Sequence, residues 1–246
     1  MAELVEGRHE ARVERITLDG YGGVAVDAVH ARPEGDALRG LVVHPDIGGV
    51  RPLFDELCRR LATHGLAVCA PEPWARVPES ERAGLDVTAR MERMSERDDT
   101  AQLGDLVRAA DYLRATDGVD TVAVLGFCMG GMYALKAAGT GVFDRAVVFY
   151  GMIRVPEEWR GSGQGEPLDA AVDACPTLAF FGDHDPWTPA PDIDALRAAW
   201  AGHSEHEIVV YPGADHGFVH DPARPAHRSD AAADAWQRAL AFLAVA

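Results

Sequence analysis

A cysteine stands at the apex of a glycine-rich turn within residues 121–132, whose sequence is TVAVLGFCMGGM. An apolar run that predicts a strand ends there, and a helix is expected to start at Met129. The pattern G-x-C-x-G-G is therefore the cysteine form of a nucleophile elbow, in which Gly126 and Gly130 let strand and helix approach closely. The side chain of Cys128 would stand clear of the sheet at a helix N-terminus, where the helix dipole favours a thiolate. The N–H group of Met129 would face an oxyanion formed on an attacked substrate.

Two loops further along the chain carry an acid and a base that would complete a catalytic triad. One, FFGDHDPWTP, follows a predicted strand and contains Asp183 and Asp185; the next, YPGADHGF, contains His216. We expect His216 to be the base and Asp185 to orient it, in the chain order Cys, Asp, His of the α/β-hydrolases. Asp183 is expected to brace its turn through backbone N–H groups. The alternatives are a structural cysteine in the core and a histidine that only stabilises a turn.

The elements that must position these residues alternate along the chain, which predicts the α/β class. Short apolar strands are expected at residues 40–44, 66–70, 122–125, 145–150, 177–181 and 207–211. Helices are expected at residues 52–64, 103–113, 129–138, 193–200 and 231–242. This alternation predicts a mostly parallel central sheet with helices on both faces, and residues 13–19 and 24–31 add a hairpin at its edge. The length and the 48% hydrophobic content suit a single domain over residues 1–246.

Two polar stretches interrupt the alternation. Residues 71–99 are rich in Glu, Asp and Arg, and we expect them to form a cap that faces the substrate; the alternative is a solvated charged helix. Residues 151–174 contain the run GSGQGEP and are predicted to form an irregular surface excursion. Trp74 and Trp187 fall in loops near the proposed site, where they would line an apolar pocket unless they only pack at the surface.

The charge and composition of the chain limit the partners and the cellular locations that can be expected. The formal net charge of −16 argues against nucleic acid or an anionic membrane surface as a partner, because both select basic patches. The first residues lack the basic and apolar regions of a secretory signal, and no apolar run reaches the roughly 18 residues of a membrane span. Four cysteines without scaffold-like spacing suggest reduced thiols in the cytoplasm. We expect no metal and no cofactor, a small-molecule substrate, and a monomer or a homodimer.

The three motifs around Cys128, Asp185 and His216, with the loop PDIGGV at residues 45–50, resemble the dienelactone hydrolase family over about residues 13–244. The resemblance implies an α/β-hydrolase fold and hydrolysis of an ester or lactone through a thioacyl-enzyme. It also implies that the N–H group of Ile47 supplies the second donor of the oxyanion hole. Before that residue the family places a Glu that helps to ionise the thiol. Asp46 stands there in this chain, as a candidate for that role or as a brace of the loop.

A second departure from the family concerns the substrate. Family members that cleave dienelactone are described as holding a substrate carboxylate with two arginines. One position falls just after the catalytic histidine, where this chain has Val219 and His220 and no arginine. The other falls among residues 85–95, where Arg90 and Arg93 are the candidates. The resemblance implies a hydrolase of the carboxymethylenebutenolidase type, and the missing arginine means that the chemistry carries over to this chain better than the substrate does. The alternatives are a general carboxylesterase or thioesterase, and a non-catalytic binding protein of the same fold.

Overall fold

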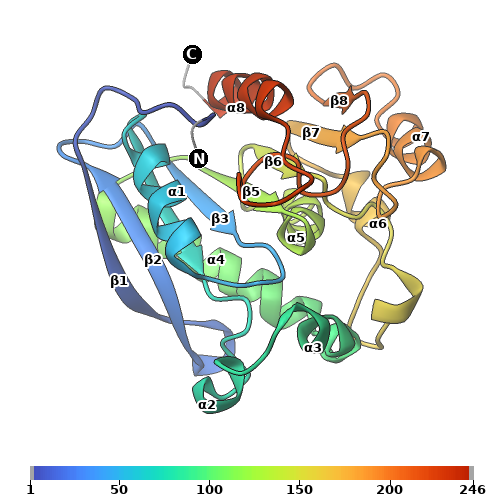
Figure 1. The fold of residues 1–246 in the computed structure, drawn as a ribbon. Coiled ribbons are helices and arrows are strands. Elements are labelled where there is room, and N and C mark those ends of the chain that lie inside the picture. The colour runs from blue at the N-terminus through green and yellow to red at the C-terminus, as the bar shows by residue number, and fades with distance from the viewer. Residues whose placement is uncertain (1–2, 244–246) are drawn as a thin grey trace.

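The computed structural model describes residues 3–243, which build one eight-stranded sheet flanked by helices (Figure 1). The strand order across the sheet is β1-β2-β4-β3-β5-β6-β7-β8. The strands are β1 Ala11–Asp19, β2 Ala25–Pro33, β3 Arg39–His44, β4 Leu66–Pro71, β5 Val122–Phe127, β6 Ala146–Phe149, β7 Thr177–Gly182 and β8 Glu207–Tyr211. The predicted strands are all present, and the α/β-hydrolase class is confirmed.

The sheet is parallel except at one edge. The hairpin β1–β2 is antiparallel, and β2 also pairs antiparallel with β4, whereas every pair from β4 to β8 is parallel. Parallel neighbours require long crossovers, and the helices between the strands supply them. The carboxyl ends of β3, β5, β7 and β8 consequently meet along one edge of the sheet, where their loops can share a site.

Within residues 3–243, eight α-helices surround the sheet. They are α1 Pro52–Ala62, α2 Glu79–Arg82, α3 Val87–Glu92, α4 Asp99–Asp117, α5 Met129–Ala138, α6 Pro167–Ala171, α7 Ala190–Ala199 and α8 Ser229–Leu243. Three short 3-10 helices lie at Tyr21–Gly23, Met94–Glu96 and Glu157–Trp159. Phe54 of α1 and Trp236 of α8 both contact the Phe127 ring, at centroid distances of 6.1 and 5.9 Å, so these two helices cover the same face. Helix α4 contacts α5 and covers the opposite face.

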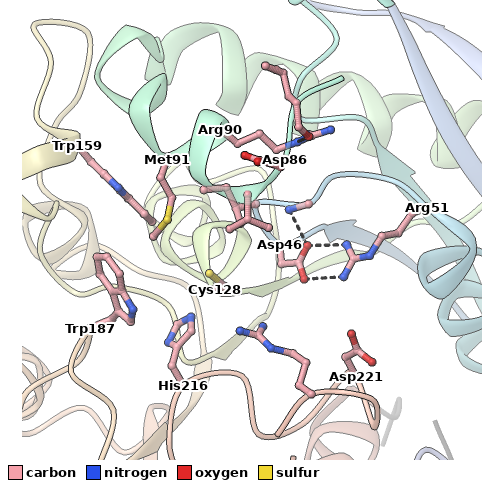
Figure 2. Close-up of a pocket in the computed structure, with 15 residues that line it drawn as sticks. Asp46, Arg51, Asp86, Arg90, Met91, Cys128, Trp159, Trp187, His216 and Asp221 are labelled. Carbon is pink, nitrogen blue, oxygen red and sulfur yellow. Dashed lines mark hydrogen bonds and ion pairs between the residues drawn. The ribbon is translucent and has the colours of Figure 1, made fainter. Parts of the chain in front are cut away.

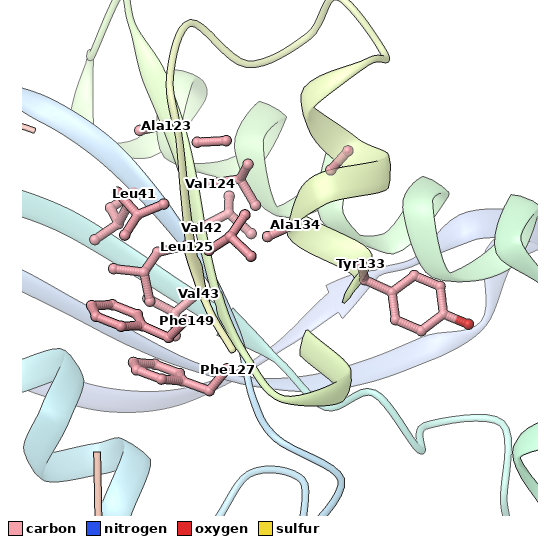
Figure 3. Close-up of a cluster of buried hydrophobic side chains, with 14 of the residues drawn as sticks. Leu41, Val42, Val43, Ala123, Val124, Leu125, Phe127, Tyr133, Ala134 and Phe149 are labelled. Carbon is pink, nitrogen blue, oxygen red and sulfur yellow. The ribbon is translucent and has the colours of Figure 1, made fainter. Parts of the chain in front are cut away.

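The core lies between these layers, and Figure 3 shows its centre around β3 and β5. Both strands are buried along their whole length, because helices cover both faces of the sheet. On the α1–α8 side the rings of Phe127, Phe149 and Phe180 stack across three neighbouring strands, at centroid distances of 4.9 and 5.0 Å. Truncating one such ring to alanine costs about 3–5 kcal/mol in comparable cores. This packing holds the end of β5 rigid, directly before Cys128.

The two polar stretches contain more structure than their composition indicates. Residues 71–99 include α2 and α3, and residues 151–174 include α6 and the 3-10 helix Glu157–Trp159. Helix α4 begins earlier than its apolar pattern predicts, because the carboxylate of Asp98 accepts a hydrogen bond from the N–H of Thr100 at 2.8 Å. Within residues 3–243, no helix combines the length and the apolar character that crossing a membrane requires.

Candidate active site

Cys128 occupies the sharp turn between β5 and α5. Its backbone has φ 57° and ψ −121°, a conformation that side-chain-bearing residues rarely adopt. The turn is so tight that a Cβ atom on Gly126 would lie 1.9 Å from the carbonyl oxygen of Gly130. Only glycine therefore fits at position 126. The Cys128 N–H donates to the carbonyl of Phe149 at 3.0 Å, which ties the turn to the neighbouring strand. These restraints hold the thiol at the carboxyl edge of the sheet.

His216 and Asp185 meet beside this thiol. The two side chains come from the loops after β8 and β7, and Nδ1 of His216 lies 2.8 Å from Oδ2 of Asp185. The other carboxylate oxygen accepts the N–H of Trp187 at 2.8 Å, which fixes the acid. Because Nδ1 faces the carboxylate, Nε2 is left for Cys128 (Figure 2). Asp183 accepts the N–H of Gly213 at 2.5 Å and so braces the turn.

The charge of His216 depends on its neighbours. Burial alone would lower the pKa of His216, but the Cys128 thiolate and the hydrogen bond to Asp185 outweigh burial and raise that pKa from 6.5 to about 10. A protonated imidazole beside a thiol would favour the thiolate form and could later donate a proton.

A cavity of about 540 Å³ opens over the thiol. Figure 2 shows two kinds of wall around Cys128 and His216. One wall is apolar and consists of Leu85, Val87, Met91, Trp159 and Trp187. The other carries charge and includes Asp46, Arg51, Arg90, Asp221 and Arg224. A substrate in this cavity would place an apolar group against one wall and a polar or charged group against the other.

Two backbone donors lie at the elbow. The N–H groups of Ile47 and Met129 make no hydrogen bond to any other residue within 3–243, so both are free to bind an oxyanion. The loop after β3 packs directly on the start of α5. The two are so close that a Cβ on Gly130 would come within 2.4 Å of the Pro45 carbonyl oxygen. Trp74 holds the same loop from behind, since its indole N–H donates to the carbonyl of Ile47 at 2.9 Å.

The chain is similar to known proteins in sequence and in structure. The sequence profile of the Dienelactone hydrolase family matches residues 26–246. The chain belongs to the dienelactone hydrolase family. The expected class of enzyme, a hydrolase of ester or lactone bonds, is thereby confirmed.

Relatives and solved structures within the family are similar over nearly their whole length. An Escherichia coli protein with the provisional name carboxymethylenebutenolidase is 31% identical over 243 residues, which is 96% of this chain and 89% of that protein. A Bradyrhizobium protein named provisionally as a 2-oxo-3-(5-oxofuran-2-ylidene)propanoate lactonase is 30% identical, over 94% of this chain and 95% of its own. The crystal structure of a provisionally named dienelactone hydrolase from Klebsiella pneumoniae superposes with a TM-score of 0.85 at 30% identity, covering 94% of this chain and 98% of that one.

Asp46 stands where the family is expected to have a Glu, and both of its carboxylate oxygens have hydrogen-bond partners. Its carboxylate accepts two hydrogen bonds from Arg51 at 2.6 and 2.8 Å and one from the Gly48 N–H at 2.9 Å, and it lies 2.7 Å from Nε2 of His220. Burial alone would raise the pKa of Asp46, but the hydrogen bonds from His220 and Arg51 lower it well below its usual range. These contacts are those of a residue that braces its loop.

Three residues expected to contact the substrate do not line the cavity. His220 is fully buried beneath it, and Trp74 is only 1% exposed and lies behind the loop that follows β3. Arg93 faces a separate hollow and pairs with Glu81 at 3.4 Å. Arg90 and Trp187 are the two candidates that line the cavity.

The sequence interpretation missed Trp159, Arg51 and Arg224. Trp159 comes from the stretch read as an irregular excursion, yet its ring stacks on Trp187 with the centroids 5.3 Å apart. Arg224 follows the histidine loop, and its guanidinium lies over the Cβ-less Gly217, next to His216. The only signal in the sequence was its position soon after His216, and the fold is needed to show that the Arg224 side chain turns back to the cavity.

Proposed function

We propose that this chain hydrolyses an ester or enol lactone through a thioacyl intermediate on Cys128. The thiolate sulfur attacks the carbonyl carbon, and the resulting oxyanion accepts hydrogen bonds from the N–H groups of Met129 and Ile47. As the carbon–oxygen bond to the leaving group breaks, Nε2 of His216 gives its proton to the departing oxygen. The products of this step are a thioester and an alcohol or, for a lactone, a tethered enol.

The second half-reaction returns the enzyme to its resting state. His216, now neutral, takes a proton from a water molecule that attacks the thioester carbonyl. The same two N–H groups hold the second oxyanion. The carbon–sulfur bond then breaks, and the thiolate again faces an imidazolium that Asp185 keeps in the correct orientation.

One observation carries this proposal. A cysteine in a strained turn conformation faces His216, whose other ring nitrogen lies 2.8 Å from Asp185, at the floor of a cavity that can hold a small molecule. A structural cysteine would not require such a conformation, and a binding protein would not require the oriented histidine.

The charged wall favours a substrate that carries an anion. Arg51 is already paired with Asp46, whereas the guanidinium of Arg224 makes no hydrogen bond or salt bridge with another residue of the described part of the chain. Nη1 of Arg90 is likewise buried without a hydrogen-bond partner there. We therefore expect Arg90 and Arg224 to bind a carboxylate on the substrate, as in a carboxylate-bearing lactone.

Hydrolysis of a short p-nitrophenyl ester and of a dienelactone, by the native chain and by Cys128→Ala, tests the proposal. We expect activity on the lactone that the substitution abolishes. Activity on the simple ester alone would keep the mechanism and reassign the chain as a general carboxylesterase or thioesterase.

Thiol labelling supplies an independent check of the nucleophile. The other cysteines are Cys58, Cys69 and Cys175, and burial raises the pKa of each, that of Cys175 to about 12. We expect iodoacetamide to modify Cys128 far faster than these three. Equal rates would contradict the assignment of Cys128 as the nucleophile.

The four free thiols also lead us to propose a cytoplasmic location.

A further inference from the structure

A buried chain of hydrogen bonds runs beneath the cavity floor. Nδ1 of His220 lies 2.5 Å from the hydroxyl of Tyr150, and Nε2 lies 2.7 Å from Oδ2 of Asp46. His220 is 0% exposed, and its ring stacks on Phe127 at a centroid distance of 4.7 Å. The proposed reaction uses neither His220 nor Tyr150, so this chain of contacts requires a separate explanation.

The direction of each hydrogen bond follows from the groups involved. An ionised carboxylate only accepts, so Nε2–H of His220 donates to Asp46. Burial lowers the pKa of His220, which therefore carries a single ring proton at neutral pH. Nδ1 is then an acceptor, and the hydroxyl of Tyr150 donates to it. The hydrogen bonds that link Tyr150, His220 and Asp46 can therefore all form in one arrangement of protons only, which gives this network a defined geometry.

This network of hydrogen bonds joins three of the loops that build the site. Asp46 directly precedes Ile47 in the loop after β3, and Tyr150 directly follows β6, next to the elbow. His220 lies on the loop after β8, which also carries His216. The Tyr150 ring meets the His216 ring edge-on at 5.2 Å. A displacement of His220 would therefore move the backbone at Ile47 relative to the nucleophile.

Asp46 has no acceptor site left for the thiol. A carboxylate offers about four acceptor positions. Here Oδ1 accepts from the Gly48 N–H and from Arg51, while Oδ2 accepts from Arg51 and His220. A hydrogen bond from Cys128 would have to displace one of these four hydrogen bonds.

We propose that His220 is a positioning residue, which through Asp46 fixes the N–H of Ile47 in the oxyanion hole, and that Asp46 does not activate the thiol. This inference rests on the proposed hydrolysis through Cys128. It assigns the pair of Asp46 and His220 to stabilisation of the tetrahedral oxyanion and leaves ionisation of the thiol to His216.

The test compares two rates in each variant: ester hydrolysis, which needs the oxyanion hole, and iodoacetamide alkylation of Cys128, which forms no oxyanion. His220→Leu removes both hydrogen bonds. We expect it to lower kcat about 10- to 100-fold with KM within threefold, and to leave the alkylation rate unchanged. His220→Gln places an amide N–H near the position of Nε2, so it should restore part of kcat.

His30 provides a matched control. It is also buried in a Tyr–His–Asp arrangement, 3.2 Å from the Tyr112 hydroxyl and 2.9 Å from Asp117, but at the hairpin edge of the sheet. His30→Gln should cost similar stability in a urea titration and leave kcat unchanged. Every variant is assayed at a temperature at which circular dichroism shows it fully folded.

The outcomes separate the explanations. A parallel fall of alkylation and kcat in the His220 variants would show that the pair of Asp46 and His220 acts on the reactivity of the thiol, and would overturn the inference. An equal loss of kcat in His30→Gln would reduce His220 to a purely structural role. Failure of the proposed function itself would appear in the native chain, as fast alkylation of Cys128 without turnover of any ester or lactone, and the positioning role would fall with it.

Discussion

Two histidines on the same loop each pair with a carboxylate at nearly equal distance, yet one ring is positively charged and the other is neutral. His216 is 2.8 Å from Asp185, and His220 is 2.7 Å from Asp46. The pKa of His216 is raised, against the effect of burial, because a thiolate stands on its other side. The pKa of His220 is lowered, because burial and the guanidinium of Arg51 oppose a second positive charge. The carboxylate alone does not set the protonation of a histidine; the group on the far side of the ring decides it.

Removing the carboxylate of each pair should have unequal consequences. Asp185→Asn would let the imidazole adopt the wrong tautomer, and we expect kcat to fall about 1,000- to 10,000-fold. Asp46→Asn should lower kcat less, about 10- to 100-fold, because it only loosens the oxyanion loop. Steady-state kinetics on a p-nitrophenyl ester measures both. Equal losses would mean that the two pairs play equivalent parts.

Removing the thiolate should change one histidine only. In Cys128→Ser, the pKa of His216 should fall from about 10 toward or below its ordinary 6.5, whereas His220 should remain neutral. Because the folded-state pKa of His216 is raised, the stabilisation that it contributes is fully present below about pH 6.5 and is lost as the pH rises through about 10. NMR titration of the ring protons would report both histidines. An unchanged His216 titration in the serine variant would show that the thiolate is not its partner.

Removing the guanidinium beside Asp46 tests the other pair. Arg51→Met breaks a bidentate, partly buried ion pair, and we expect a loss of about 2 kcal/mol in the free energy of unfolding. The pKa of His220 should rise, since Arg51 contributes to lowering it. Chemical denaturation gives the first quantity and NMR the second. Arg197→Met is a surface control, because Arg197 pairs with Asp194 one helical turn away and should cost almost nothing.

The smallest expected effect concerns the free guanidinium next to His216. Arg224→Ala should raise KM about tenfold for a carboxylate-bearing lactone and leave KM for a neutral ester unchanged. Comparing the two substrates with one enzyme preparation removes errors in active-site concentration. A similar rise for both substrates would mean that Arg224 shapes the cavity and does not recognise an anion.

The sequence predicted the parts of the site that depend on local backbone. A strand, a turn with glycines on both sides and a helix specify the elbow of Cys128, and loops after successive parallel strands specify where Asp185 and His216 lie. What a side chain meets across the fold was not predictable in the same way. Trp74 and His220 lie close in sequence to residues of the site, yet both turn inward and form hydrogen bonds with polar groups of the loop that follows β3. Trp159 reaches the cavity from a stretch without periodicity, so no pattern pointed to it.

At Cys128 the stability of the fold and the proposed catalysis favour different residues, because the backbone there is strained. A residue held at φ 57° and ψ −121° costs of order 1–3 kcal/mol when it bears a side chain, and glycine there would relieve much of that cost. Replacement of Cys128 by glycine would therefore yield a more stable protein that lacks the proposed nucleophile. If such a chain were released from selection for its chemistry, the gain in stability would favour the loss of this cysteine, and only continued demand for turnover keeps the strained residue in place.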